Sequence, residues 1–530
     1  MDRVRHKRNY DLHSWTGVAL GFFLFVVCFT GSVALFYNEI LSWEDPNKRI
    51  TLPAEPAAFN ETFTEWHAEL EASGEVEYLN VYFPRLHAPY YAAYAHVDLP
   101  DGSHVDHSVQ WHPETLEMLP ERADGMARWL YDFHRDLMWP AKLGGRTVGR
   151  ALVGVAGVIL LLAIVSGVIA HTKIREELFT LRYMRSMRLK WQDTHKVLGL
   201  WGLPFYSMIA LTGAVLGIVT LLAPIIAILA FKGDQQALFD AVIGQPPEPV
   251  GQQVQMMSVD DIYAMPHPES GERPWYVATH NWGDEAAVLD IYYKEDRKLI
   301  SAEGRTVSAV TGEPAYSATT DTKTPGNRLV AAMSPLHYGT FGGIALKALY
   351  FVLGLSLAVI TALGTMMWIE RRLHGNEGAK SERFYRRLSR FNVGICAGIG
   401  FASAGLLVHG VLYAGAESSR LFWTGTAYFA LWFAALAYAM VRKDEYRTTS
   451  ELVGLSGILL LTASVLNMVT TGHGIAHGLF GDGHAPTAWV DVTLIGLGAA
   501  SIAVALALPK KRAEKTKRRR ESTAEVVPAE

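Results

Sequence analysis

Cysteine is almost absent from the sequence. Only Cys28 and Cys396 occur among 530 residues, and each lies inside a long apolar run. A framework of disulfides is therefore excluded, and packing is the expected role of both thiols. Nucleotide-binding fingerprints are missing as well, since no G-x-G-x-x-G motif stands between a strand and a helix. Any redox reaction would therefore need an external electron donor.

Charged residues are also scarce. They make up 19% of the chain, whereas hydrophobic residues make up 50%. The apolar residues gather in runs of about 20 residues or more, the length that an α-helix needs to cross the hydrocarbon layer. These runs cover residues 14–40, 149–171, 196–231, 342–369, 391–414, 422–441, 451–471 and 488–508. We therefore expect an α-helical polytopic membrane protein with about eight transmembrane helices.

The basic residues indicate the orientation of these helices. Clusters of Lys and Arg lie at the N-terminus, in every second loop and at the C-terminus, within residues 3–8, 173–190, 371–390, 442–447 and 510–520. The positive-inside rule places all of them in the cytoplasm. The expected location is the bacterial inner membrane, crossed several times, with both termini cytosolic and close to membrane lipid. This topology explains the basic tail better than a nucleic-acid partner does, so none is expected.

Two long segments are expected on the opposite, periplasmic side. In both, aromatic and β-branched residues alternate with polar ones between turn residues, which is typical of short antiparallel strands. The predicted parts are span 1 (1–41), periplasmic segment 1 (42–148), spans 2 and 3 with a basic loop (149–231), periplasmic segment 2 (232–341), span 4 (342–375), an added block of four helices (391–508) and a basic cytosolic tail (509–530). The fold class is thus α-helical with two small α+β segments.

The first four spans contain an internal repeat. Asp11, His13, Gly17, Thr30 and Gly31 recur as Asp193, His195, Gly199, Thr212 and Gly213, each 182 residues later. A looser match relates His134, which precedes Gly144 and Gly145, to His337, which precedes Gly342 and Gly343. The repeated unit is a span, a periplasmic segment and a second span. Two such units predict an up-down bundle with an approximate twofold axis.

Histidines stand at the ends of these four spans. His13, His171 and His195 lie at the cytosolic ends, while His134 and His337 precede spans 2 and 4 on the periplasmic side. Ionisable residues at membrane depth are costly, and neutral imidazole is a strong ligand for iron. The repeat predicts one haem between His13 and His195 and another between His134 and His337, with His171 as a third cytosolic candidate. A lone histidine at a helix end is more often an interface residue, but pairs on both faces favour a cofactor.

Basic residues near the periplasmic pair have two interpretations. Arg146, Arg150 and Lys347 would neutralise haem propionates, or they would extend to the membrane interface as long basic side chains ordinarily do.

A second group of histidines lies in the added block: His409, His473 and His477, with His484 close by. His473 and His477 are four residues apart and would share one face of a helix. The group is a candidate metal site, and a loop at the membrane interface is the alternative.

Several segments resemble the PepSY-associated transmembrane family. NYDLHSWTGVALGFFLFVVCFTGS at the start, TGEPAYS and SPLHYGTFGG farther on, and ERRL after span 4 follow the motif order of that family. The resemblance covers residues 1 to about 375, and residues 391–530 fall outside its shorter members. It implies PepSY-like periplasmic segments, b-type haem, and reduction of ferric siderophores at the inner membrane. The family's haem-binding role is carried over to His13, His134, His171, His195 and His337, and two haems are expected.

The leading hypothesis is an oxidoreductase, a transmembrane ferric-chelate reductase. Electrons from quinol or a cytosolic reductase would enter on the cytosolic side and reduce Fe(III) in a ferric siderophore or other ferric chelate in the periplasm. Since hard oxygen donors prefer Fe(III), reduction would release Fe(II). An electron-transfer subunit for another periplasmic acceptor is the first alternative. A haem-free transporter or scaffold is the second, because internal repeats are common in transporters.

Overall fold

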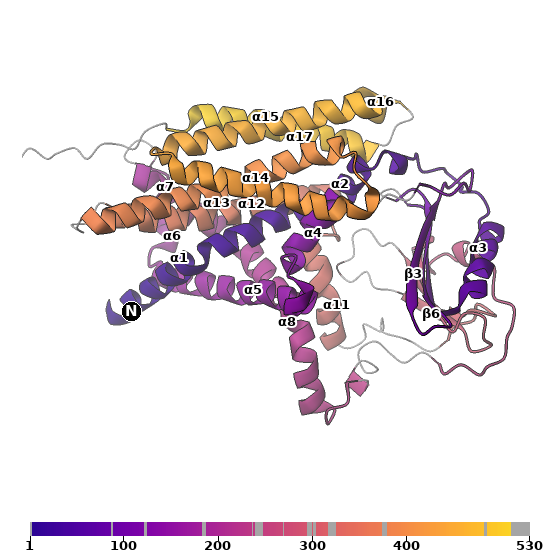
Figure 1. Cartoon of the computed structure of the whole chain (residues 1–530). Helices are drawn as coiled ribbons and strands as arrows, with labels where there is room; N and C mark the ends of the chain where they lie inside the picture. Colours follow the sequence, from indigo (N-terminus) through magenta and orange to yellow (C-terminus); the bar gives the residue numbers. More distant parts are fainter. Residues whose placement is uncertain are drawn as a thin grey trace, which may run out of the picture.

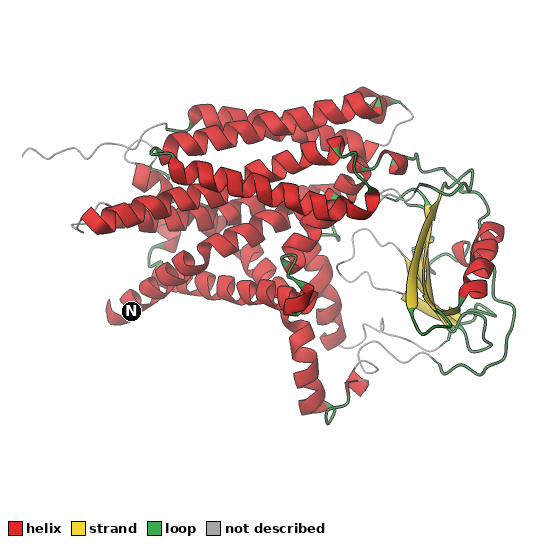
Figure 2. Cartoon of the chain, viewed as in Figure 1, coloured by secondary structure: helices red, strands yellow, loops and turns green. Residues whose placement is uncertain are grey.

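Long helices lie side by side in the protein, and a single β-sheet stands beyond one end of them (Figures 1 and 2). The computed structural model describes residues 3–85, 88–120, 125–182, 187–235, 237–238, 247–268, 270–293, 299, 304–315, 325–373, 379–481 and 485–509. The predicted basic tail from residue 510 onward and His484 lie outside these described residues.

Seven helices among the described residues are long and apolar enough to cross a membrane. They are α1 (Arg3–Ala34), α5 (Gly145–Ala170), α12 (Gly343–Leu373), α13 (Ala379–Leu412), α14 (Arg420–Val441), α15 (Glu445–Thr471) and α17 (Ala485–Ala507). Helices α7 (Met187–Trp201) and α8 (Leu203–Ala230) meet at a bend of 70°, and taken together as one span they would be the eighth. The predicted polytopic helical fold is confirmed.

The third span differs from its prediction as one continuous helix over residues 196–231. Its helix breaks at Gly202, because Pro204 in the first turn of α8 has no N–H to continue the hydrogen bonds of α7. Packing also requires a glycine at this point, since a Cβ at Gly202 would lie 2.1 Å from the ring of Tyr206. The break leaves His195 on α7, which packs against α12, whereas α8 packs against α5.

The spans form two neighbouring groups (Figure 1). In the first group, α1 packs between α5 and α12, α5 packs against α8, and α12 packs against α7. The second group is the added block, in which α13 contacts α14 and α15, and α15 contacts α17. The block joins the first group where α12 packs against α13.

The two segments outside the bundle build one six-stranded antiparallel sheet, in the order β3-β2-β1-β4-β5-β6. The first segment supplies β1 (Glu75–Tyr82), β2 (Tyr91–Asp98) and β3 (His104–Trp111), and the second supplies β4 (Pro274–His280), β5 (Val288–Tyr293) and β6 (Gly304–Ser308). Strands β1 and β4 pair at the centre, with Leu79 opposite Thr279. The two segments predicted separately therefore share one sheet.

The two faces of this sheet have different surroundings. Helix α3 (Asn60–Ser73) covers one face, where Phe63 and Trp66 pack with Leu79 and Leu289. The other face turns toward the end of the helical bundle (Figures 1 and 2). Because side chains alternate along a strand, this open face carries the remaining residues of the strands: Tyr78, Tyr82, Tyr94, His96, Tyr276 and Tyr292.

Two amphipathic helices link the sheet to the bundle. Helix α4 (Met126–Asp136) packs against α1 and α5, and α11 (Pro325–Tyr338) packs against α8. Helix α2 (Tyr37–Glu44) follows α1 and packs on α4. The shorter helices are α6 (Ile174–Glu177), α10 (Val259–Tyr263), α16 (Ile475–Phe480) and the 3₁₀ turns Pro46–Lys48, Ala141–Leu143 and Glu417–Ser419. We call the end of the bundle beside the sheet the sheet end, and the end where α1 begins the far end.

Candidate functional site

The first candidate site lies at the far end, where His13 of α1 faces His195 of α7. The centres of the two rings are 6.1 Å apart and their planes are inclined by 73°. Nδ1 of His13 donates to the carbonyl oxygen of Ala163 at 2.8 Å, and Nδ1 of His195 donates to that of Ile360 at 3.0 Å. Since a carbonyl only accepts, Nδ1 carries the proton in each ring, and Nε2 of each neutral imidazole is the nitrogen left for a metal. We call these residues the far pair.

Glycines make room for both rings of the far pair. Gly167 lies one turn after Ala163 in α5, and Gly364 lies one turn after Ile360 in α12. A Cβ at Gly167 would lie 3.0 Å from the ring of His13, and a Cβ at Gly364 would lie 3.4 Å from that of His195. Each ring therefore packs on a glycine and donates to the carbonyl one turn earlier.

The second candidate site lies at the sheet end, where His134 of α4 faces His337 of α11. Their ring centres are 6.3 Å apart, and the planes differ by only 16°. Nδ1 of His134 donates to the carbonyl oxygen of Val27 at 3.0 Å. Nδ1 of His337 lies 2.9 Å from Oγ1 of Thr212, whose own proton goes to a carbonyl of its helix. We call His134 and His337 the sheet-end pair.

The sheet-end pair also packs on glycines. A Cβ at Gly31 of α1 would lie 2.6 Å from the ring of His134, and a Cβ at Gly213 of α8 would lie 3.1 Å from that of His337. Gly31 and Gly213 are equivalent positions of the internal repeat, like Thr30 and Thr212. The two halves of the repeat therefore share the glycine contacts of the imidazoles as well as the sequence pattern.

Burial keeps the sheet-end imidazoles neutral. Desolvation lowers the pKa of His134 to about 4. It lowers the pKa of His337 to about 3, with a further contribution from the neighbouring His134. Both rings are therefore uncharged at physiological pH, and neutral imidazole is the form that ligates metals.

The spacing within each pair fits two ligands on opposite sides of one metal ion. An imidazole nitrogen binds a transition metal at about 2 Å and lies about 1 Å from its own ring centre, so two trans imidazoles have ring centres about 6 Å apart. A pocket of about 310 Å³ adjoins the sheet-end pair, and one of about 830 Å³ adjoins the far pair. These volumes lie within the roughly 300–1,000 Å³ typical of small-molecule and cofactor sites.

Cationic side chains border the sheet-end pocket. Arg135 and Arg150 line it, and Nε of Arg150 is buried without a hydrogen-bond partner among the described residues. A buried unpaired guanidinium nitrogen favours an anionic group in the pocket. The other two predicted cations already have carboxylate partners, since Arg146 approaches Asp132 at 3.7 Å and Lys347 reaches Glu39 at 2.5 Å. Arg150 is therefore the predicted residue best placed to hold a propionate.

His171 lines the far pocket, but its contacts differ from those of the far pair. Its Nδ1 accepts from the backbone N–H of Lys173 at 3.3 Å, and its Nε2 lies 3.4 Å from Oε2 of Glu177. Nε2 is buried and has no hydrogen-bond partner among the described residues. Since Nδ1 accepts from a backbone N–H, the proton of a neutral His171 ring lies on Nε2, unlike in the far pair, and a haem-binding role of His171 stays a prediction.

The histidines of the added block are only partly brought together. His473 and His477 have ring centres 4.9 Å apart, and Nδ1 of His473 donates to the carbonyl oxygen of Thr471 at 2.9 Å. The ring of His409 lies against Tyr413, with centres 5.7 Å apart. No third ligand joins them among the described residues, and a metal site there stays a prediction.

The added block contributes to the sheet-end site through α4, the helix that carries His134. Trp129 of α4 is 1% exposed and packs on Tyr428 of α14, with ring centres 4.3 Å apart. Glu44 of α2, which is not part of the block, also holds α4: its Oε2 accepts from the backbone N–H groups of Met126 and Ala127 at 2.8 and 3.3 Å and caps the helix. Apart from a candidate metal site at its histidines, the sequence predicted no role for this block, and the contact of Trp129 with Tyr428 shows that it anchors α4.

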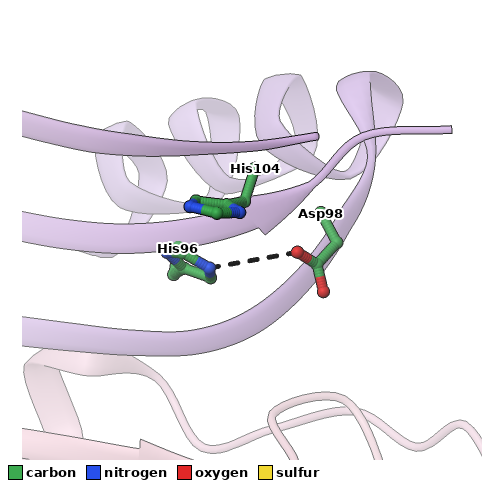
Figure 3. A group of neighbouring side chains, drawn as sticks. All are labelled: His96, Asp98 and His104. Carbon is green, nitrogen blue, oxygen red and sulfur yellow. Dashed lines mark ion pairs between the residues drawn. The ribbon is translucent and has the colours of Figure 1, made fainter. Parts of the chain in front are cut away.

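One further cluster lies on the open face of the sheet and was not predicted. His96, Asp98 and His104 bring their ligand atoms within 4.8 Å of one another (Figure 3). A sequence signal for it exists, because the triplet His-Val-Asp occurs at residues 96–98 and again at 104–106, on either side of a turn. Antiparallel pairing of β2 with β3 then places His96 opposite Asp106 and Asp98 opposite His104.

Comparison with known proteins identifies the part of the chain that carries both histidine pairs. The family described as PepSY-associated TM region matches residues 10–371, which include all five predicted haem-binding histidines and stop before the added block. The Uncharacterized protein PA4219 of Pseudomonas aeruginosa is 27% identical over 363 residues, covering 66% of this chain and 88% of that protein. The match extends over more than half of the chain, and the protein therefore belongs to the PepSY-associated TM region family.

Proposed function

We propose that the protein is a transmembrane electron-transfer protein that binds two b-type haems and reduces ferric chelates. The observation that carries the proposal is the duplicated histidine pair. Each pair has ring centres about 6 Å apart, protons on Nδ1 and a pocket beside it, and the pairs lie toward opposite ends of the bundle. At 1.5 Å per residue, α1 extends over roughly 27 Å from His13 to Gly31, the contact of His134, which is close to the thickness of the hydrocarbon layer.

Haem supplies one-electron redox chemistry when it is bound, and the residues of this chain hold and tune it. The far pair and the sheet-end pair would hold the haem iron through Nε2. Their Nδ1 hydrogen bonds fix the ring orientation and raise the basicity of the ligand nitrogen. Glycines such as Gly31 and Gly167 leave the volume that the rings need. Arg150 offers its unpaired Nε to a propionate.

The direction of electron flow follows from the charge distribution. Basic residues gather near the far end, as at Arg371 and Arg372 beside the far pocket. By the positive-inside rule this supports a cytoplasmic far end and a periplasmic sheet in a bacterial cell. Electrons enter from quinol or a cytosolic reductase at the far end. A quinol gives up two electrons and two protons, which suffices for two ferric chelates.

The open face of the sheet is the proposed platform for a ferric siderophore. It carries stacked tyrosines at its centre, since the ring of Tyr276 lies 4.7 Å from that of Tyr82 and 5.1 Å from that of Tyr292. Aromatic faces suit the flat, often aromatic iron-binding groups of siderophores. The face also turns toward the end of the bundle that holds the sheet-end pair (Figure 1). One electron converts Fe(III) to Fe(II), which oxygen-donor chelators bind more weakly.

An optical spectrum of the purified protein tests this proposal. We expect the dithionite-reduced protein, in mild detergent, to show six-coordinate b-type haem at about two per chain. Addition of a ferric siderophore under anaerobic conditions should then restore the oxidised spectrum. Well-folded protein without haem would contradict haem binding. Reduced haem that no ferric chelate reoxidises would contradict the proposed reaction.

A further inference from the structure

The cluster on the open face of the sheet has the chemistry of a metal site. His96 and Asp98 lie on β2 and His104 lies on β3, next to the turn that joins the two strands (Figure 3). The ring centres of His96 and His104 are 5.0 Å apart. Two imidazoles and one carboxylate with free positions beside them form a donor set that suits divalent first-row transition metals, including Fe(II).

A second carboxylate orients the central histidine. Oδ1 of Asp106 lies 2.6 Å from Nδ1 of His96 and accepts its proton. Nε2 of His96 is thereby directed to the other side of the ring, where Asp98 lies at 3.9 Å and Glu77 at 3.4 Å. A carboxylate behind one imidazole nitrogen, with the other nitrogen among further ligands, is the usual arrangement of histidines at metal sites.

The sheet holds this arrangement in place while leaving it open to ions. Register pairing fixes His96 opposite Asp106, and the ring of Tyr78 stacks on that of His96, with planes only 2° apart. The side chain of His96 is 16% exposed, whereas those of Asp98 and Asp106 are 55% and 57% exposed. The imidazole is thus rigid and the carboxylates are accessible from solvent. Three carboxylates with two imidazoles also give the negative charge that attracts a dication.

We propose that His96, Asp98 and His104 bind a divalent transition-metal ion, with Asp106 as the positioning residue and Glu77 as a further ligand. In the protein's reaction the ion is Fe²⁺, an assignment that rests on the proposed ferric-chelate reduction. Fe²⁺ would be the product released beside this face, and the site would retain it without a change of oxidation state. Nitrogen and oxygen donors generally bind Zn²⁺ and Cu²⁺ more tightly than Fe²⁺. The ion that is bound therefore depends on which ion is released or available at this face of the sheet.

Metal titration of the full-length protein tests the site. Haem-loaded protein in detergent is titrated anaerobically with Co²⁺, as an optical probe, and with Fe²⁺. We expect the wild type to bind one more ion per chain than the double variant His96→Ala, His104→Ala. The matched control is His107→Ala, a histidine on the same strand but outside the cluster. Asp106→Ala keeps the three ligands but removes the acceptor of His96 Nδ1, and it should bind the ion about 10–100-fold more weakly.

Equal stoichiometry in the wild type and the double variant would overturn the metal site. An unchanged affinity in Asp106→Ala would overturn the positioning role. Haem content and reoxidation by ferric siderophore are measured on the same samples, so a failure of the proposed reaction appears separately as haem that stays reduced. If the reaction proceeds, Fe²⁺ should reach a soluble Fe(II) chelator faster from the double variant than from the wild type. Equal rates would overturn the assignment of Fe²⁺.

Discussion

Each histidine of the two pairs depends on the small volume of a residue in a neighbouring helix. The tightest contact is at Gly31, where a Cβ would lie 2.6 Å from the ring of His134. Gly31→Ala should therefore displace His134, cost about 1–3 kcal/mol of stability and lower the haem content from about two per chain toward one. The measurement is haem per chain by pyridine haemochrome. Gly496→Ala, in α17, is the control, because nothing lies within 4 Å of that position and it lines neither pocket. Full haem content in Gly31→Ala would show that the contact is unimportant.

Substitution of single histidines separates the alternatives at the far end. Nδ1 of His13 donates to a carbonyl of α5, which leaves Nε2 for a metal. Nδ1 of His171 instead accepts from the backbone N–H of Lys173, so the proton of its neutral ring lies on Nε2. We expect His13→Ala to bind about one haem per chain and His171→Ala to bind about two, as the wild type does. Difference spectra of the two variants, reduced minus oxidised, provide the readout. The opposite result would make His171 the ligand and His13 the interface residue.

At the level of elements, the sheet-end site depends on α4 being held by the added block. Trp129 is buried against Tyr428, and its loss would leave a large cavity between α4 and α14. Trp129→Ala should cost about 3–5 kcal/mol and lower haem binding at the sheet-end pair more than at the far pair. Thermal unfolding and haem content measure the two effects. Trp423→Ala on α14 is the control, since Trp423 is 50% exposed and its loss should change stability little.

The elements also show what the sequence predicts and what it leaves open. Apolar runs and the constant offset between His13 and His195 predict the spans and the pairs, because both are local or repeated patterns. The pairing of β1 with β4 was not predictable, since alternation along a strand does not specify a partner some 200 residues away. The bend at Gly202 was missed because the span was predicted from hydropathy alone, which does not register the missing N–H of Pro204. The capping of α4 by Glu44 was also missed, because the two are about 80 residues apart in the sequence and no local pattern links them.

At the level of the whole molecule, the sheet and the basic far end lie at opposite ends of the bundle (Figure 1). The proposed direction of electron flow therefore depends on the orientation of the chain in the membrane. Ser103, in the turn between β2 and β3, and Lys443, between α14 and α15, are both exposed and lie away from the two pockets. The two native cysteines lie within the apolar helices α1 and α13 and are half-buried.

Cysteine labelling at these two positions measures the orientation. In spheroplasts treated with a membrane-impermeant maleimide, Ser103→Cys should react at once, because the positive-inside rule places the sheet outside. Lys443→Cys should react only after the membrane is opened. The wild type is the control and should remain unlabelled in both conditions. Labelling of Lys443→Cys in intact spheroplasts would show that the chain has the opposite orientation. Ferric chelates docked on the sheet would then be reduced in the cytoplasm, and electrons would enter from outside.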